Sequence, residues 1–494
     1  MLREEQKAKR KVLLPVFRLS ELTEQDDPRA IKRIVKQSNG RPAVTYYYRF
    51  VSEENEQPGY NYNLLPVVLD TKSAPWVLGN LYILSELEGK IEPIMKTFYS
   101  LAVDLGAFKE WLDAQNNPDE VLFNFPRKKL TRTTYRFRGF LSRQIQAREI
   151  APSTAKRRMG AVVAFYRWLI KNKFLRVEFP TWEEKDYQLS FKTNHGQQLS
   201  KKVSGTDLSI SAPKAEDALD ETIVDGGNLR PLTGAEQNWL LEAILAKSNS
   251  ECLLMHLFML GTGSRIESTC TLRLRHFTDS DPGYSKSLTG EGQVYRLNAG
   301  PGTGIETKYE KSGTSQIPRE LYDLMHTYAL STRAAARRNK FTHKYGPHPD
   351  PYLFVTQQGN PYYVAKTEAK LFSSDVRRRY EMNGQAVRQF IKDHVIPYVR
   401  ERYDSNFYYR PHDLRASFGM NMTEFLEKKI EEKNINRHEA RMTIKDLLWH
   451  ASVDTTDLYL NYKIKIDNYR AAINGYGEHL RQWTDRAMRG LDVI

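Results

Sequence analysis

A long polar stretch divides this sequence into two parts with helical character. Between Trp182 and Leu232 the chain is rich in Ser, Gly, Lys, Asp and Pro, and its apolar residues follow neither the helix period nor the strand period. On both sides, apolar residues recur at intervals of three and four, as in amphipathic helices. The 494 residues also exceed the roughly 250 to 300 that one hydrophobic core usually serves. We therefore expect separate domains, joined by a linker at residues 182–231.

The apolar pattern predicts the contents of each domain. Short alternating segments, for example at 44–51, lie between turns with Pro and Gly and predict a strand-containing module at 1–85, for which the sequence indicates no role. Helical periodicity predicts a helical domain at 86–181 and another at 232–494. In the second, a Gly- and Ser-rich stretch with strand-like runs at 283–318 is most simply a β-hairpin. The predicted fold class is mainly α, with a small antiparallel β-sheet in the C-terminal domain.

Positive charge is concentrated in the first helical domain. Lys and Arg outnumber Asp and Glu by 74 to 60 in the whole chain, and fifteen Lys or Arg residues with a single acid lie between Arg127 and Arg176. Such an excess favours a polyanionic partner, either nucleic acid or an anionic membrane surface. Because aromatic and aliphatic residues are interleaved with the charges, we expect a folded basic surface rather than a disordered tail. The candidate phosphate contacts are six basic residues of this stretch: Arg132, Arg136, Arg138, Lys156, Arg157 and Arg158.

The cysteines and the apolar runs argue against several other classes of protein. Cys252 and Cys270 are the only cysteines, and neither has a Cys or His partner at metal-ligand spacing, so we expect no disulfide scaffold, metal site or cofactor. The first twenty residues lack the apolar core of a signal peptide, and the longest apolar run, near 253–260, is too short to span a bilayer. We expect a cytoplasmic protein that does not act in a membrane.

Short motifs in the second half of the chain contain the candidate catalytic residues. In chain order they are Gly261-Thr262-Gly263-Ser264-Arg265, Thr307-Lys308, His412-Asp413-Leu414-Arg415, Leu448-Trp449-His450, and Tyr459 nine residues after that histidine. In content and order they resemble the motifs of the tyrosine recombinases, or phage integrases. The resemblance covers residues 232–462 as the catalytic domain and, more loosely, 86–175 as the helical core-binding domain of that family. Residues 1–85 have no counterpart in it.

Three features depart from the family pattern. The position three residues after the first arginine, where the family more often has an acid, holds Ser268, and Glu267 stands one residue earlier. Trp449 precedes the second histidine, where glycine is common. The interval from the second arginine to that histidine is longer than usual and includes a charged insert at 427–441. None of the three removes a candidate catalytic group.

The residue types suit cleavage of a phosphodiester without a metal ion. The pentavalent transition state gains negative charge on its nonbridging oxygens, which the guanidiniums of Arg265 and Arg415 can hold by charge-assisted hydrogen bonds. Tyr459 is the candidate nucleophile, but a neutral phenol with a pKa near ~10 needs a base or a positive field to lose its proton. Lys308, on the predicted hairpin, is a candidate general acid for the leaving 5′ oxygen, and Lys311 lies close enough to compete.

The resemblance also implies roles for two histidines. His412 is the candidate base or proton relay and His450 the candidate hydrogen-bond donor to the phosphate, although the sequence does not settle how they divide these tasks. Tyr462, three residues beyond Tyr459, is the alternative nucleophile. The other histidines, such as His256, are interpreted as ordinary core or surface residues.

For the whole protein, the resemblance implies an activity and an assembly. The two helical domains would close as a C-shaped clamp around double-stranded DNA, and cleavage through a 3′-phosphotyrosine would need neither metal nor ATP. A homotetramer on two DNA sites, with or without accessory proteins, would serve integration, excision or transposition of a mobile element. Type IB topoisomerase-like nicking and resealing, and a catalytically silent DNA-binding relative, are the alternative functions. The tail from about residue 464 has an apolar face that could pack on a neighbouring protomer or in cis.

Overall fold

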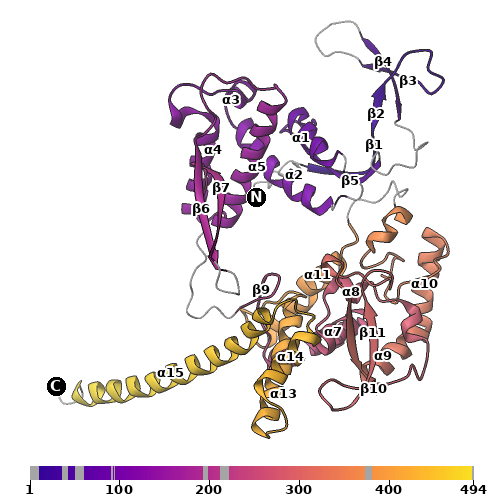
Figure 1. The fold of residues 1–494 in the computed structure, drawn as a ribbon, viewed down its shortest axis with the longest axis vertical. Helices are drawn as coiled ribbons and strands as arrows, with labels where there is room; N and C mark the ends of the chain where they lie inside the picture. The colour runs from indigo at the N-terminus through magenta and orange to yellow at the C-terminus, as the bar shows by residue number, and fades with distance from the viewer. Residues whose placement is uncertain are drawn as a thin grey trace, which may run out of the picture. The chain divides into compact units, whose positions relative to one another are not determined.

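The computed structural model describes residues 11–35, 43–50, 61–88, 90, 93, 95–192, 198–211, 222–372 and 381–491. It is about half helical, with several small antiparallel sheets. The chain divides into two units, Met1–Ala215 with Ser373–Tyr380 and Glu216–Phe372 with Glu381–Ile494 (Figure 1). No helix in the described part of the chain is both long enough and apolar enough to cross a membrane.

The first unit begins with strands, as the alternating segments predict. β1 (Lys11–Arg18) pairs antiparallel with β5 (Asn61–Val68), and β2 (Ser20–Leu22), β4 (Val44–Phe50) and β3 (Ile31–Val35) form a second antiparallel sheet in that order. Residues 1–10, 36–42 and 51–60 of the predicted N-terminal module lie outside the described residues.

Helices follow the strands and enclose an aromatic core. They are α1 (Val77–Leu87), α2 (Met95–Asp113), α3 (Pro118–Leu122), η1 (Lys129–Thr131), α4 (Thr133–Gln146) and α5 (Pro152–Lys171). Phe108 of α2 contacts Phe137 of α4 edge-on at 4.9 Å between ring centroids and also contacts Phe165 of α5. All three rings are fully buried, so the apolar stripes of three helices meet in one core.

The predicted linker contains more structure than its composition indicates. β6 (Glu184–Lys192) and β7 (Gln198–Thr206) form an antiparallel hairpin in the first unit, and Leu208 and Ile210 are buried in that unit's core. The strand period extends over only a few apolar residues in a polar background, which explains why the pattern was missed. Residues 193–197 and 212–221 of the predicted linker lie outside the described residues.

The second unit is built around one buried helix, α7 (Ser250–Thr262). α7 packs against α6 (Gly234–Ala246), α8 (Ile266–Cys270), α9 (Arg319–Leu330) and α13 (Asp413–Glu431). Met255, Phe258 and Met259 of α7 lie in the same apolar core as Leu414 of α13. The remaining helices of this unit are η2 (Leu274–Phe277), η3 (Lys308–Glu310), α10 (Thr332–Tyr345), η4 (Lys366–Phe372), α11 (Gln385–Phe390), η5 (Ile391–Val395), α12 (Ile396–Arg402), α14 (Arg437–Leu447) and α15 (Val453–Leu491).

The predicted hairpin at 283–318 is an antiparallel sheet of three strands. β10 (Ser285–Lys286), β11 (Gln293–Ala299) and β12 (Gly313–Pro318) lie in that order, with Leu297 opposite Ser315. The loop from 300 to 312, between β11 and β12, carries both candidate lysines. A second, shorter hairpin, β8 (Ile223–Val224) and β9 (Asn228–Leu229), also belongs to this unit.

Tyr459 and the tail share one helix. α15 is 39 residues long, so the tail expected from about residue 464 continues the helix that carries the candidate nucleophile. Large apolar side chains along its later turns are exposed, among them Ile464, Ile473, Tyr476 and Met488. Packing of this face in cis and packing on a neighbouring protomer both stay predictions.

Candidate active site

The first arginine is positioned by a glycine turn at the end of α7. Gly263 caps that helix in the left-handed conformation with φ of 68°, and a Cβ atom there would lie only 2.6 Å from the Phe418 ring. The turn directs the chain so that Arg265 becomes the residue before α8. Its guanidinium is mostly buried, and Nη2 lies 3.7 Å from a carboxylate oxygen of Asp225.

The second arginine is held at three points. Arg415, in the first turn of α13, donates from Nε to Asp225 Oδ2 at 2.7 Å and from Nη1 to the Gly263 carbonyl at 2.8 Å. Its Nη2 donates to the Leu448 carbonyl. Two of these acceptors are backbone carbonyls of neighbouring segments. They fix the orientation of the guanidinium even when another group replaces the Asp225 carboxylate.

Asp225 lies at the centre of a cluster formed with Arg265, Arg415, His450 and Tyr459, and no sequence motif marks it. Its Oδ2 atom accepts hydrogen bonds from Arg415 Nε, from the Tyr459 hydroxyl at 3.1 Å and from His450 Nε2 at 3.3 Å. Burial opposes its charge, but the hydrogen bond from His450 and the charge of Arg415 prevail and hold the pKa of Asp225 well below its usual range. The cluster therefore binds one fully ionised carboxylate.

Tyr459 is the best-buried of the predicted catalytic residues. Its side chain has no exposed surface, and its ring stacks on His450 with 5.7 Å between centroids. Burial, reinforced by the Asp225 carboxylate, raises the pKa of Tyr459 well above its ordinary value, so the hydroxyl keeps its proton in this state. The alternative nucleophile, Tyr462, is partly buried against the apolar core that includes Leu448 and Ile444.

The two histidines contact different groups of Asp225. His450 uses Nε2 toward the carboxylate and Nδ1 toward the Thr456 hydroxyl at 3.0 Å, so a neutral ring donates to the first and accepts from the second. His412 Nε2 lies 3.1 Å from the Asp225 carbonyl, which only accepts, so that nitrogen carries a hydrogen. Burial lowers the pKa of both histidines, although their contacts with Asp225 oppose the shift.

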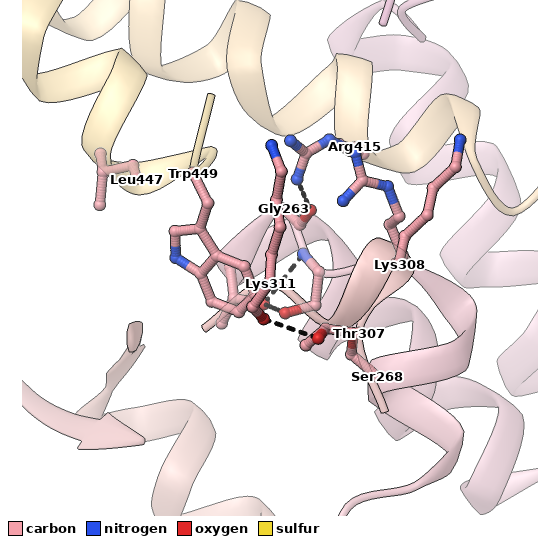
Figure 2. Close-up of a pocket in the computed structure, with 11 residues that line it drawn as sticks. Gly263, Ser268, Thr307, Lys308, Lys311, Arg415, Leu447 and Trp449 are labelled. Carbon is pink, nitrogen blue, oxygen red and sulfur yellow. Dashed lines mark hydrogen bonds between the residues drawn. The ribbon is translucent and has the colours of Figure 1, made fainter. Parts of the chain in front are cut away.

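The candidate lysines line a narrow pocket beside Arg415 (Figure 2). Lys308 is half-buried, and its ammonium lies close to the turn of Asp225, since a Cβ atom built on Gly226 would be 3.0 Å from Lys308 Nζ. Lys311 is exposed, and its backbone carbonyl accepts from the Thr307 hydroxyl at 2.6 Å. Both lysines therefore line the pocket, and the Lys308 ammonium lies beside the turn that carries Asp225.

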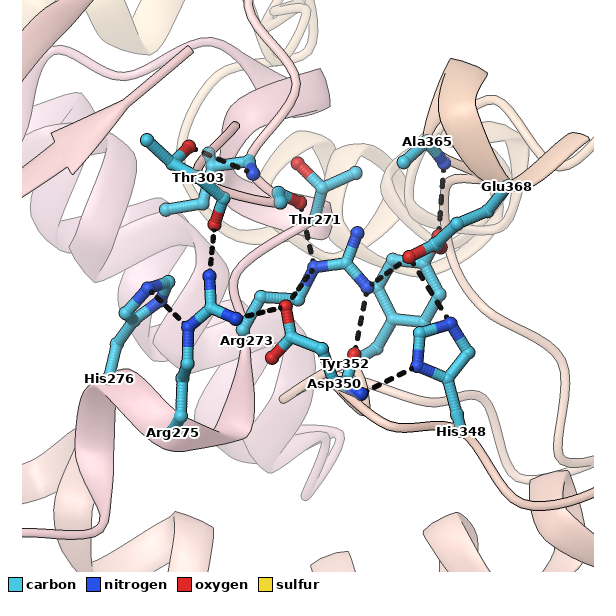
Figure 3. A network of polar contacts seen from close by, with 12 residues as sticks. Thr271, Arg273, Arg275, His276, Thr303, His348, Asp350, Tyr352, Ala365 and Glu368 are labelled. Carbon is cyan, nitrogen blue, oxygen red and sulfur yellow. Dashed lines mark hydrogen bonds and ion pairs between the residues drawn. The ribbon is translucent and has the colours of Figure 1, made fainter. Parts of the chain in front are cut away.

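The loop that carries the lysines is fastened to the segment after Arg265. Ser268, at the position where the family more often has an acid, donates to the Glu306 carbonyl at 2.6 Å. Arg273, which is fully buried, donates to the Gly304 carbonyl at 2.7 Å and pairs with Glu368 at 2.8 Å (Figure 3). These contacts hold the loop against the segment after Arg265. The two lysine side chains of the loop line the pocket.

Trp449 replaces the common glycine at a position with positive φ, 52°. Its indole Nε1 donates to the Thr314 carbonyl at 3.1 Å, and the ring covers Gly313, where a Cβ atom would come within 2.4 Å of it. The tryptophan thus ties the turn before His450 to strand β12. Packing of this ring compensates for the backbone conformation that glycine would adopt more easily.

The six basic residues predicted to contact DNA differ in their surroundings in the first unit. Arg132 is buried and donates to the carbonyls of Pro126, Arg127 and Pro180, so the structure gives it a packing role that the sequence prediction did not foresee. Arg157 pairs with Asp104 through two hydrogen bonds, at 2.8 and 3.0 Å.

The other four are more accessible than Arg132. Lys156 is exposed, whereas Arg136, Arg138 and Arg158 are half-buried, and Arg136 donates to the Gln115 side chain at 2.7 Å. Arg157 is exposed as well, so its charge is engaged by the pair with Asp104 and not by burial.

Comparison with known proteins finds similar solved structures. The Tn1549 transposon integrase in complex with circular intermediate DNA is 16% identical, with a TM-score of 0.34 over 78% of this chain and 94% of that one. A variant of that integrase in complex with transposon right-end DNA is 14% identical, with a TM-score of 0.34 over 80% and 99% of the two chains. No family model and no curated protein matches the sequence. At these sequence identities and TM-scores, the comparisons do not establish a function for this chain.

Proposed function

We propose that this protein is a tyrosine recombinase, which breaks and rejoins duplex DNA with Tyr459 as its nucleophile. One observation carries the proposal: Arg265, Arg415, His450 and Tyr459 all converge on one buried anion, the Asp225 carboxylate. A carboxylate and a phosphodiester each carry one negative charge on two terminal oxygens. A pocket that holds the first is therefore suited to the second.

The proposed reaction exchanges one phosphate ester for another. The Tyr459 oxygen attacks the phosphorus, its proton passes to His412 or to water, and Arg265 and Arg415 hold the nonbridging oxygens as their charge grows. The bond from phosphorus to the 5′ oxygen breaks, and that oxygen takes a proton from Lys308. The products are a 3′-phosphotyrosine and a free 5′ hydroxyl, and attack by another 5′ hydroxyl reverses the step without ATP.

The rest of the family's behaviour belongs to the same proposal. Arg136, Arg138, Lys156 and Arg158 would contact phosphates from the first unit, which would close with the second as a C-shaped clamp on DNA. A homotetramer on two sites would exchange strands during integration, excision or transposition of a mobile element. Two observations support DNA as the ligand: the basic stretch from 127 to 176 and the cationic cluster around Asp225.

A covalent adduct tests the nucleophile. Nicked duplexes, tiled across the DNA that flanks the coding sequence, are incubated with the protein in EDTA and resolved on a denaturing gel. We expect a protein–DNA adduct from the wild type and from Tyr462→Phe, and none from Tyr459→Phe. An adduct that persists with Tyr459→Phe would move the nucleophile elsewhere, and DNA binding without any adduct would favour the catalytically silent relative.

Joining separates the recombinase from its nearest rival. A type IB topoisomerase nicks and reseals one strand, so it relaxes supercoiled plasmid and leaves two labelled duplexes unconnected. We expect this protein to transfer a labelled strand from one site to a second site. Relaxation with no transfer between sites would support the topoisomerase-like alternative.

A further inference from the structure

The anion in the proposed phosphate site belongs to the protein itself. Asp225 lies at the tip of the β8–β9 hairpin, in the turn Asp225-Gly226-Gly227. Asp225 is only 5% exposed, and its carboxylate lies within hydrogen-bond distance of Arg415, His450 and Tyr459. Three of the groups that would bind and attack a phosphate are therefore already occupied.

A phosphate in this site would compete with the Asp225 carboxylate. Both would take the same donor atoms of Arg415 and His450, and two anions in one buried pocket repel each other strongly. Tyr459 is affected most, because its hydroxyl donates to Asp225 and its oxygen has to be free to attack phosphorus. If the phosphate takes these donors, the Asp225 side chain has to leave before Tyr459 can attack.

The residues of the hairpin anchor its strands and give conformational freedom to its tip. Ile223 and Leu229, on either side of the turn, are buried against the core that includes Phe418 and Leu448. The tip between them contains two glycines with φ of 70° and 158°, so it can change conformation at little steric cost. The Arg415 guanidinium keeps its two carbonyl acceptors when the tip leaves, so the site would retain its shape.

From this arrangement we propose that Asp225 is an autoinhibitory plug, which fills the scissile-phosphate site of the free protein and is displaced by DNA. The inference rests on the proposed function for the identity of the displacing anion. The competing explanation is that Asp225 acts as the base for Tyr459. The two predict opposite effects of its removal, since loss of a base slows cleavage and loss of a plug speeds it.

Inorganic phosphate tests the plug without any catalysis. Thermal unfolding midpoints are measured from zero to 100 mM phosphate, at constant ionic strength, for the wild type, Asp225→Asn and Glu251→Gln. Glu251 is the matched control, because it is an equally buried carboxylate that pairs with Arg333 and Arg337 at the far end of α7.

The expected pattern is specific to Asp225. The wild type and Glu251→Gln should respond weakly, whereas phosphate should raise the midpoint of Asp225→Asn and bind it about tenfold more tightly or better, because no internal anion competes. Equal phosphate affinity in wild type and Asp225→Asn would overturn the proposal.

The adduct assay separates this idea from the proposed function. On the same nicked DNA, Asp225→Asn should form the adduct faster than the wild type, and a slower reaction would overturn the plug in favour of a base. If no protein forms an adduct but phosphate binds Asp225→Asn more tightly, the plug stands and the proposed function fails. If the wild type forms the adduct and the variant binds phosphate no better, the proposed function stands and the plug fails.

Hydrogen exchange of the wild type keeps the proposal testable should Asp225→Asn not fold. The Asp225 amide donates within the turn, to the carbonyls of Ile223 and Gly227 at 3.2 and 3.1 Å. We expect peptides that cover 222–230 to exchange faster when mixed-sequence duplex DNA binds, because the tip opens. Slower or unchanged exchange would contradict displacement.

Discussion

The two lysines of the loop between β11 and β12 differ in what surrounds their ammonium groups. Lys308 lies by the turn of Asp225, whereas Lys311 is exposed. A general acid contributes about 10²- to 10⁴-fold, so we expect Lys308→Ala to slow adduct formation by roughly that factor and Lys311→Ala by less than about tenfold. A substrate with sulfur in place of the leaving 5′ oxygen should restore Lys308→Ala, because a thiolate leaves without a proton. Equal losses in both variants, or no rescue by sulfur, would assign the acid elsewhere.

Acid should weaken the second unit through a buried histidine. His256 donates from Nδ1 to the Cys252 carbonyl at 2.7 Å and contacts the Tyr409 hydroxyl through Nε2, and burial lowers the pKa of His256 to about 4. Between pH ~6.5 and 4, His256 is protonated in the unfolded chain but stays neutral in the folded chain. The contribution of His256 to the free energy of unfolding is therefore complete above pH ~6.5. It is lost on acidification, by up to about 3 kcal/mol at pH 4.

Urea unfolding between pH 8 and pH 4.5 measures this effect. We expect His256→Gln to be less stable than the wild type at pH 8 but to lose less stability as the pH falls. His394→Gln, at an exposed histidine, is the control and should follow the wild-type curve. Parallel curves for wild type and His256→Gln would exclude this histidine as the source.

Single residues also show what the sequence could and could not reveal. Arg265, His412, Arg415, His450 and Tyr459 were found by motif and spacing, and the structure brings them to one place. Asp225 was missed because it precedes those motifs and lies in a polar segment that resembles a linker. The available signal was local: the turn sequence Asp-Gly-Gly between two short apolar runs, which favours a tight hairpin.

At the scale of elements, the contact between α13 and α15 decides where Tyr459 lies. A Cβ atom on Gly419, in the middle of α13, would come within 2.4 Å of the Tyr459 ring. Alanine in a helix interior normally gains about 0.5 to 1 kcal/mol over glycine, but here we expect Gly419→Ala to lose about 1 to 3 kcal/mol and most of the adduct. Gly160→Ala, in α5 with nothing within 4 Å, is the control and should gain stability.

Denaturant unfolding and the adduct gel measure the two effects of Gly419→Ala together. Wild-type stability and adduct yield in this variant would mean that the two helices separate easily and do not position the tyrosine. Loss of adduct with stability retained would still support positioning, since the ring would have moved without unfolding the unit.

Elements were predictable where the apolar period is long and unpredictable where it is short. The nineteen-residue helix α2 and the helix α5 follow stripes at intervals of three and four, so their existence was clear from sequence. The β6–β7 hairpin was not, because polar residues dominate both of its strands. β10 was also absent from the prediction, since two residues carry no readable period.

For the whole molecule, the division of the chain follows from where its buried residues lie. Leu208 and Ile210 are buried in the first unit, whereas Ile223 and Leu229 are buried in the second. Both ends of the predicted linker at 182–231 are therefore packed into one of the two units. Among the described residues, the part of it that lacks buried apolar side chains is shorter than predicted. Composition located the boundary, but only packing shows which unit each end of the polar stretch belongs to.

The salt dependence of DNA binding tests how the charge of the first unit is used. Each phosphate contact releases counterions and steepens the slope of log affinity against log salt by about 0.9. We expect Lys156→Gln to reduce the slope by about that amount, because this exposed ammonium forms no ion pair among the described residues. Arg157→Gln should leave the slope nearly unchanged and should lower stability instead, because Arg157 pairs with the buried Asp104. Binding isotherms from about 50 to 300 mM salt decide between them, and equal changes in slope would mean that Arg157 leaves Asp104 when DNA binds.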